Sequence, residues 1–234
     1  MIQLFYGDCL DIMPTLPAQS VDAIITDLPY GTTACKWDTI IPFAPMWEAV
    51  KHVLKPKGAF ITTASQPFTS ALIMSNPKWF RYEWIWEKPK ATLFLSAKKQ
   101  PLKAHENIIV FCDGSTLYNP QMTKGKMHKS GRKNTKEYSE VYGSIKDTMT
   151  ERDDYYPRSV LQIKHEIKPT HPTQKPVALY EYLIKTYTHE GDTVLDMAFG
   201  SCTTGEACIN TGRNFIGIEK DEKYFQIGKN RLGE

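Results

Sequence analysis

The stretch VLDMAFGSCTTGEA, residues 194–207, reads as a short apolar strand that leads directly into a glycine turn and the start of a helix. The next strand pattern, NFIGIE at 214–219, ends on the carboxylate of Glu219. Strand, glycine turn, helix, strand and acid in this order are typical of a nucleotide-binding unit, in which the turn receives the cofactor and the acid binds its ribose. Cys202 stands where a dinucleotide site has its central glycine, which argues against the diphosphate of NAD or FAD.

The rest of the chain alternates short apolar runs with helical periodicity, which predicts an α/β fold with a doubly wound, mainly parallel, Rossmann-like sheet. Strands are expected at 2–6, 21–26, 58–64, 80–87, 105–112, 192–197 and 214–219, and helices at 9–16, 43–54, 66–76, 176–188, 203–211 and 221–232. Since the nucleotide-binding half comes last, the N-terminal strands must continue its sheet. We therefore expect 1–112 and 166–234 to form one domain, into which the polar, weakly periodic segment 113–165 is inserted.

Composition excludes several other classes of protein. The 234 residues carry a net charge of +3, too small to indicate a partner by itself. The five cysteines are scattered without a CxxC pair, and there is no HExxH, so neither a disulfide framework nor a metal site is expected. No signal peptide and no apolar run of transmembrane length is visible, which predicts a cytoplasmic protein without membrane contact.

The positive charge is concentrated in QMTKGKMHKSGRKNTK, residues 121–136, which has six basic side chains and no acid. One interpretation is a solvated loop, and the other is a loop that follows the phosphates of a nucleic acid. The second interpretation makes the following residues candidate DNA contacts: Lys124, Lys126, Lys129, Arg132, Lys133 and Lys136.

A second polar sequence, TDLPYG at 26–31, follows the apolar strand pattern of 21–26. Together with HPTQKP at 171–176 and the glycine turn, it makes the chain resemble the DNA amino-methyltransferases of the permuted, beta-type order. In that family a D-P-P-Y catalytic motif comes first, a target-recognition segment second, and H-P-T-Q-K-P with the S-adenosylmethionine turn last. FYGD at 5–8, LKPKGAFI at 54–61, WEKPK at 86–90 and GRNFIGIE at 212–219 also resemble that family.

The resemblance implies the domain roles and the site residues. It makes 1–112 the catalytic half, 113–165 the target-recognition segment and 166–234 the cofactor-binding half. The catalytic loop would consist of Asp27, Leu28, Pro29 and Tyr30. The S-adenosylmethionine site would consist of Asp8, Cys9, Asp27, His171, Thr173, Gln174, Lys175, Asp196, Phe199, Gly200, Ser201, Cys202, Thr203 and Glu219.

The implied reaction is methylation of the exocyclic N6 amine of adenine after the base has left the duplex. Asp27 and a backbone carbonyl would accept the two N–H bonds of the amine, so that its lone pair faces the methyl group, and Tyr30 would stack on the base. Cytosine-N4 methylation uses the same loop, usually with serine in place of Asp27, so the acid favours adenine. Methylation of a cytosine ring carbon is disfavoured because the sequence has no Pro-Cys pair.

Three departures from the family pattern leave other functions open. The usual turn resembles D-P-F-x-G-S-G, whereas here the aromatic Phe199 is displaced by one position and Cys202 replaces the second glycine; Leu28 replaces the first proline of the catalytic motif. A DNA-binding protein with impaired catalysis, or an enzyme acting on RNA, therefore remains an alternative. The expected partner is double-stranded DNA, with a homodimer and a separate restriction enzyme as further possibilities.

Overall fold

The computed structural model describes the chain except for residues 34, 36–37, 133–147 and 165–174. It divides into two compact units, one made of Met1–Asn119 with Ser159–Glu234 and the other of Pro120–Arg158. The first unit is therefore assembled from both ends of the chain, and it contains the sheet and the six α-helices described below.

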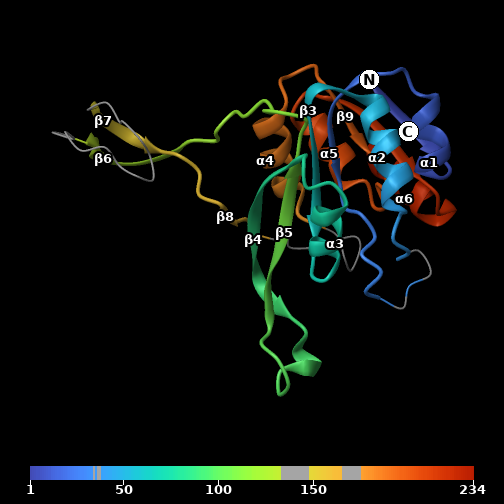
Figure 1. Cartoon of the computed structure of the whole chain (residues 1–234), viewed down its shortest axis with the longest axis horizontal. Helices are drawn as coiled ribbons and strands as arrows, with labels where there is room; N and C mark the ends of the chain where they lie inside the picture. Colours follow the sequence, from blue (N-terminus) through green and yellow to red (C-terminus); the bar gives the residue numbers. More distant parts are fainter. Residues whose placement is uncertain (34, 36–37, 133–147, 165–174) are drawn as a thin grey trace. The chain divides into compact units, whose positions relative to one another are not determined.

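The described strands of the first unit form one eight-stranded sheet in the order β1-β10-β9-β2-β3-β5-β4-β8 (Figure 1). In that order the strands are β1 (Ile2–Tyr6), β10 (Asn214–Glu219), β9 (Thr193–Asp196), β2 (Val21–Thr26), β3 (Leu54–Ala64), β5 (Lys103–Phe111), β4 (Phe80–Thr92) and β8 (Val160–Gln162). Every neighbouring pair is parallel except the two that involve β5. The expected mainly parallel sheet is confirmed.

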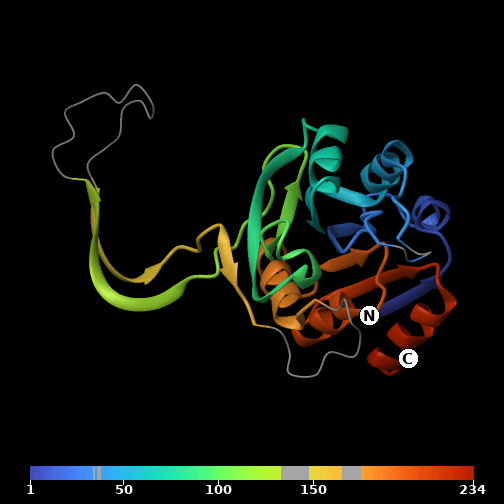
Figure 2. The same ribbon diagram turned by 90° about the horizontal axis from the view of Figure 1, so that it is seen from below.

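Successive residues of the central strands point to opposite faces of the sheet and are buried on both. Both faces must therefore be covered, and helices cover them. Ile24 and Leu195 belong to one hydrophobic core, and Ile25 and Val194 to the other. The first core is completed by α1 (Cys9–Ile12), α2 (Phe43–Val53) and α3 (Phe68–Ser75), and the second by α4 (Val177–Tyr187), α5 (Thr203–Asn210) and α6 (Glu222–Leu232). Figure 2 shows the two groups of helices on opposite sides of the sheet, as expected for a doubly wound fold.

The strands β2 and β9 lie side by side at the centre of the sheet although about 170 residues separate them in sequence. The chain leaves β9 through α5 toward β10 on one side, and leaves β2 through α2 toward β3 on the other. Ligands of open α/β sheets bind outside the carboxyl ends of the strands at such a point of divergence. The fold therefore places a candidate site where β2 and β9 end.

Several expected elements have different bounds in the structure. The helix expected at 9–16 is a single turn, α1, followed by the 3-10 turn η1 (Met13–Thr15), because Pro14 has no N–H to continue an α-helical ladder. The strand β4 continues beyond 87 to Thr92, where the 3-10 turn η2 (Phe94–Ser96) connects it to β5.

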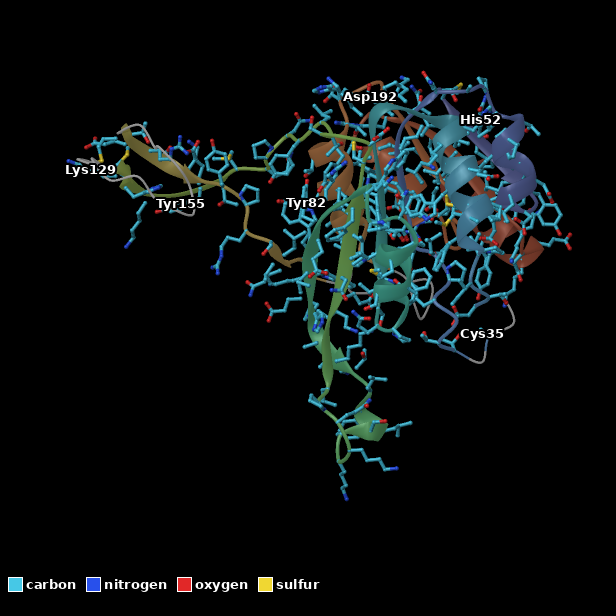
Figure 3. All side chains as sticks on the ribbon, in the orientation of Figure 1. Cys35, His52, Tyr82, Lys129, Tyr155 and Asp192 are labelled. Carbon is cyan, nitrogen blue, oxygen red and sulfur yellow. The ribbon has the colours of Figure 1, made fainter. Side chains whose placement is uncertain are left out.

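The second unit contains an antiparallel pair, β6 (Thr123–Arg132) and β7 (Thr148–Tyr155). The sequence of 113–165 has little periodicity, and these strands were not expected from it. Backbone hydrogen bonds hold the pair together, and its mostly polar side chains give no alternating apolar pattern by which a strand is recognised. His128 stacks on Tyr155, with ring centroids 4.3 Å apart; Tyr155 and Lys129 are labelled in Figure 3.

Candidate active site

One cavity of about 910 Å³ lies at the carboxyl ends of the central strands of the first unit. It joins the segments that follow β1, β2 and β9 with the end of β10. Thirteen of the predicted catalytic and cofactor residues line it: Asp8, Cys9, Asp27, Leu28, Pro29, Tyr30, Lys175, Asp196, Phe199, Gly200, Ser201, Thr203 and Glu219. The structure thus brings the TDLPYG loop and the glycine turn to the same cavity.

Asp27 directly follows β2, and three side chains donate hydrogen bonds to its carboxylate. The Tyr30 hydroxyl donates to Oδ1 at 2.7 Å, and the Thr63 hydroxyl donates to the same oxygen. The Lys175 ammonium donates to Oδ2 at 2.7 Å. Within the described part of the chain, Oδ2 accepts this one bond, so it retains the capacity to accept another from a ligand.

Lys175 lies between two carboxylates, because its Nζ is also 3.3 Å from Oε2 of Glu106 on β5. Burial alone lowers the pKa of this lysine, but the charges of Asp27 and Glu106 outweigh it and raise the pKa above its usual value. Lys88, buried on β4, is 3.5 Å from the other oxygen of Glu106. The cavity therefore holds a row of alternating charges, Asp27, Lys175, Glu106 and Lys88, in which Lys175 stays protonated.

Tyr30 presents a partly buried ring at the cavity wall. The ring stacks on Phe68 at 5.3 Å with an interplanar angle of 27°, and the Lys175 ammonium lies 5.8 Å from its centroid. Burial, followed by the charges of Asp27 and Glu106, raises the pKa of the phenol, so it remains a hydrogen-bond donor. Tyr30 is thus both a packed aromatic and a residue that lines the cavity.

The loop after Tyr30 is held by the carboxylate of Asp38. This group accepts hydrogen bonds from the backbone N–H groups of Gly31, Thr32 and Thr33 at 2.7–2.9 Å. Burial works to raise its pKa, but bonds from the Thr33 side chain and these amides outweigh burial and lower it. Asp38 therefore fixes the far end of the TDLPYG loop as a charged anchor.

Leu28 has a structural explanation that its sequence position did not reveal. Its side chain is buried in the hydrophobic core that contains Ile24 and Leu195, while the residue also lines the cavity. A leucine at this position contributes to the core, which proline would do less well. Replacement by proline would therefore cost stability, whatever it does for loop rigidity.

Asp196, at the end of β9, is nearly inaccessible and fully engaged within the protein. Its Oδ1 accepts from the Thr26 hydroxyl at 2.7 Å and the Ala198 N–H at 3.2 Å, and its Oδ2 accepts from the Thr204 hydroxyl at 2.6 Å. Burial raises its pKa to about 6, although these bonds oppose that shift. Asp196 joins the ends of β2 and β9 to the first turn of α5.

Gly200 of the glycine turn and Glu219 at the end of β10 lie side by side at the cavity. Gly200 adopts φ +51°, which disfavours side chains, and a Cβ placed on it would meet no atom within 4 Å. The Glu219 carboxylate accepts hydrogen bonds from the Gly200 N–H at 2.9 Å and the Asp221 N–H at 2.8 Å. Burial raises the pKa of Glu219. A turn without a side chain at Gly200 thus lies beside a buried carboxylate, each oxygen of which accepts one backbone hydrogen bond.

The departures in the turn are accommodated by packing. Cys202 has φ +59°, and its fully buried side chain does not line the cavity; its Sγ is 2.6 Å from where a Cβ on Gly205 would lie. The Phe199 ring occupies space left by Gly217 and Gly228, since a Cβ on either would come within 2.7 Å of that ring. The side chains of Cys202 and Phe199 therefore both fill the core beneath the turn.

Some predicted residues are not placed by the structure. His171, Thr173 and Gln174 lie outside the described residues, as do Lys133 and Lys136, and only the backbone of Arg132 is described. The remaining basic candidates lie on β6, where Lys124 pairs with Asp153 at 2.8 Å and Lys129 pairs with Glu151 at 3.1 Å. Lys126 is exposed on the same strand.

Sequence reasoning missed Thr63, Glu106 and Lys88. Lys88 belongs to WEKPK at 86–90, which resembles the family but to which no function was assigned from the sequence. Glu106 precedes the apolar run of β5, and a buried acid there needs a cationic partner. The contact between Lys88 and Glu106 could not be predicted from sequence, because it depends on the antiparallel pairing of β4 with β5.

The described residues offer neither a metal site nor a membrane-spanning helix. No group of three or more His, Cys, Asp or Glu side chains among them is arranged to hold a metal ion. None of the helices described is both long and apolar enough to cross a membrane.

Comparison with known proteins agrees with this geometry. A family model described as DNA methylase matches residues 21–230. Type II methyltransferase M.HinfI of Haemophilus influenzae is 28% identical over 97% of this chain and 67% of its own length. DNA adenine methyltransferase YhdJ of Escherichia coli K12 is 29% identical over 98% of this chain and 82% of its own length. The chain belongs to the DNA methylase family.

Two solved structures with a similar fold are compared with this chain. The M1.HpyAVI–SAM complex is 26% identical with a TM-score of 0.66, covering 99% of this chain and all of the other. The cytosine-N4-specific PvuII DNA methyltransferase has a TM-score of 0.70 at 18% identity, covering 99% of this chain and 86% of the other. The predicted family and Rossmann-like methyltransferase fold are confirmed, whereas the permuted, beta-type assignment stays a prediction.

Proposed function

We propose that this protein transfers a methyl group from S-adenosylmethionine to the N6 amine of adenine in double-stranded DNA. The observation that carries the proposal is that Asp27 and the glycine turn line the same cavity. A hydrogen-bond acceptor for an amine and a binding site for a cofactor would therefore be adjacent. An acid rather than serine after β2 favours adenine over cytosine. The similarity to a protein named as a DNA adenine methyltransferase supports the same choice.

The residues present fit this cofactor. Gly200 leaves open space where a side chain would otherwise project, and the buried Glu219 carboxylate has the acceptor chemistry that ribose hydroxyls require. We assign cofactor binding to Asp8, Gly200, Ser201, Thr203 and Glu219, with His171, Thr173 and Gln174 as further candidates. When bound, S-adenosylmethionine supplies an electrophilic methyl group on a positively charged sulfur.

The protein's own contribution is to make an aromatic amine nucleophilic. Asp27 Oδ2 accepts one N–H bond of the amine and stabilises the positive charge that develops on its nitrogen. The backbone carbonyl of residue 28 accepts the other N–H bond, and Pro29 restricts the loop that aims it. Lys175, Thr63 and the Tyr30 hydroxyl hold the Asp27 carboxylate in place, while the Tyr30 ring stacks on the flipped base.

The second unit is proposed to recognise the target DNA through phosphate contacts of β6. Two of its lysines already pair with acids of β7, so their contacts with phosphate must displace or share those acids. Neutralising Lys126 should then flatten the salt dependence of DNA affinity more than neutralising Lys124 or Lys129, as measured by titration at several salt concentrations. Equal slopes for all three variants would contradict this assignment. A homodimer and a cognate restriction enzyme stay predictions.

The decisive experiment identifies the modified base. Purified protein is incubated with labelled S-adenosylmethionine and mixed-sequence duplex DNA, which is then digested to nucleosides. N6-methyladenine is expected, and N4-methylcytosine alone would sink the proposal. If a parallel reaction shows transfer to RNA in preference to DNA, the substrate is RNA and the proposed DNA substrate is wrong. Cofactor binding without methyl transfer would favour a DNA-binding protein with impaired catalysis.

A further inference from the structure

The connection between β4 and β5 exposes three consecutive apolar side chains, Leu93, Phe94 and Leu95. Phe94 is 79% exposed, and Leu95 is fully exposed. Single exposed apolar residues are common on protein surfaces, but a contiguous group rimmed by polar residues indicates an interaction site. In Figures 1 and 3 this end of the β4–β5 hairpin extends away from the rest of the sheet, with its side chains directed outward.

The group is presented by a hydrogen-bonded turn. Leu93 has φ +66°, a left-handed conformation that is unfavourable for leucine. Backbone bonds from Ser96 N–H to the Leu93 carbonyl at 2.9 Å and from Lys99 N–H to the Ser96 carbonyl at 2.8 Å close the turn. The chain thus adopts an unfavourable backbone conformation in a segment that turns Phe94 and Leu95 outward.

The charge around this turn fits a polyanion. The stretch from 88 to 105 contains five lysines and no acid, and three of these lysines, Lys90, Lys98 and Lys99, are exposed. Thr92, Leu93, Gln100 and Lys103 also line the cavity that contains Asp27. The apolar group therefore lies at the edge of the proposed reaction site, which favours DNA over a membrane as its partner.

We propose that Phe94 and Leu95 insert into the DNA duplex beside the target base and support the stack that this base leaves, while Lys90, Lys98 and Lys99 contact the flanking phosphates. The inference rests on the proposed function, because a base must leave the duplex to reach Asp27. Proteins insert apolar side chains between base steps at a cost in stacking that further contacts with the DNA repay.

A fluorescence experiment tests the contact without requiring catalysis. In Phe94→Trp, the emission added relative to the wild-type protein should be quenched by mixed-sequence duplex DNA, because the indole stacks on bases. Vesicles of phosphatidylserine and phosphatidylcholine should leave that emission unchanged. A blue shift with vesicles and no response to DNA would overturn the proposal in favour of a lipid surface.

A kinetic experiment tests the role in base flipping. On a duplex whose methylated site has been mapped, Phe94→Ala/Leu95→Ala should reduce kcat/KM by about ten-fold or more. Placing the target adenine opposite an abasic site should restore most of that loss, because this base is already unpaired. Met74→Ala on α3 removes a side chain that is 72% exposed outside this group, and it should change neither rate.

The outcomes separate the two proposals. Equal losses on the paired and the abasic substrate would overturn the wedge while leaving methyl transfer intact. If the wild-type protein methylates neither substrate, the proposed function fails, and the fluorescence response to DNA still decides the contact. If the double variant changes only a dimer into a monomer during sedimentation, the surface is a contact between copies of the chain and the wedge is wrong.

Discussion

Two lysine–aspartate pairs of almost equal length lie in very different surroundings. Lys175 and Asp27 meet at 2.7 Å in the cavity, with side chains 11% and 33% exposed. Lys124 and Asp153 meet at 2.8 Å on the β6–β7 pair, with side chains 76% and 50% exposed. Water and salt screen the second pair, whereas the first is surrounded by further buried charges and hydroxyls. Distance alone therefore does not distinguish an ion pair within the cavity from one on the surface.

The carboxylates that line the cavity or lie beneath it differ further in how their charge is compensated. Asp27 and Glu106 share Lys175, whereas Asp196 is surrounded by two hydroxyls and an N–H. Hydrogen bonds from neutral groups offset burial only in part, which is why the pKa of Asp196 rises to about 6. Compensation by a full charge suits a group that must act as an anion, and compensation by dipoles suits a structural group.

The largest effect is expected for Asp27→Ala. Removal of a preorganised acceptor should lower the methyl-transfer rate by on the order of a hundred-fold or more. Lys175 keeps Glu106 as a partner, so the fold should survive. Initial rates with labelled cofactor measure the first effect, and circular-dichroism melting checks the second. A folded variant that retains near wild-type activity would remove Asp27 from the mechanism.

Asp196→Asn should alter how stability depends on pH. The folded-state pKa of about 6 lies above the unfolded value, so this group stabilises the fold below pH 4, and that contribution is lost as the pH rises through 6. The difference between the two plateaus is about 2–3 kcal/mol for a shift of this size. Urea unfolding of both proteins from pH 4 to 7 should show a flatter dependence for the variant. Parallel curves would mean that Asp196 does not bind the extra proton.

Glu106→Gln should act through Lys175. The charge of Glu106 helps to hold the pKa of Lys175 high against burial, so its loss lowers that pKa. The alkaline limb of the kcat/KM profile should therefore move to lower pH, with a rate loss of about ten-fold, equivalent to ~1.4 kcal/mol of positioning. Glu87→Gln, an exposed residue on the neighbouring strand β4, is the matched control. A uniform loss at every pH would indicate packing damage.

The smallest effect is expected for the exposed pair. Exchanging Lys124 and Asp153 should leave the thermal midpoint within experimental error, because both side chains remain solvated in either arrangement. Scanning calorimetry at low and high salt measures this. A large fall in the thermal midpoint would show that exposed ion pairs stabilise the second unit. Burial would then not explain the difference between the Lys175–Asp27 and Lys124–Asp153 pairs.

Most strands and helices of the first unit were predictable because their apolar periodicity is strong, whereas the short strand β8 was missed. The motifs located the cavity because parallel strands end at one edge. The Lys175–Glu106–Lys88 row was not predictable, since it depends on β5 running antiparallel between β3 and β4. In sequence, Leu28 and Cys202 are departures from the family pattern, and in the structure both side chains are buried and fill the core. The β6–β7 pair was missed because its side chains carry no alternating pattern.

The adjacency of β2 and β9 has a consequence for biosynthesis. Because β2 lies between β3 and β9, its second edge cannot be covered until the ribosome has made residues near 196. Between the synthesis of β2 and that of β9, the nascent chain therefore carries a strand with one unpaired apolar edge, a state prone to aggregation. The Asp27 loop is likewise made long before the turn that completes its cavity. Assembly of the central sheet is thus delayed until β9 has been made.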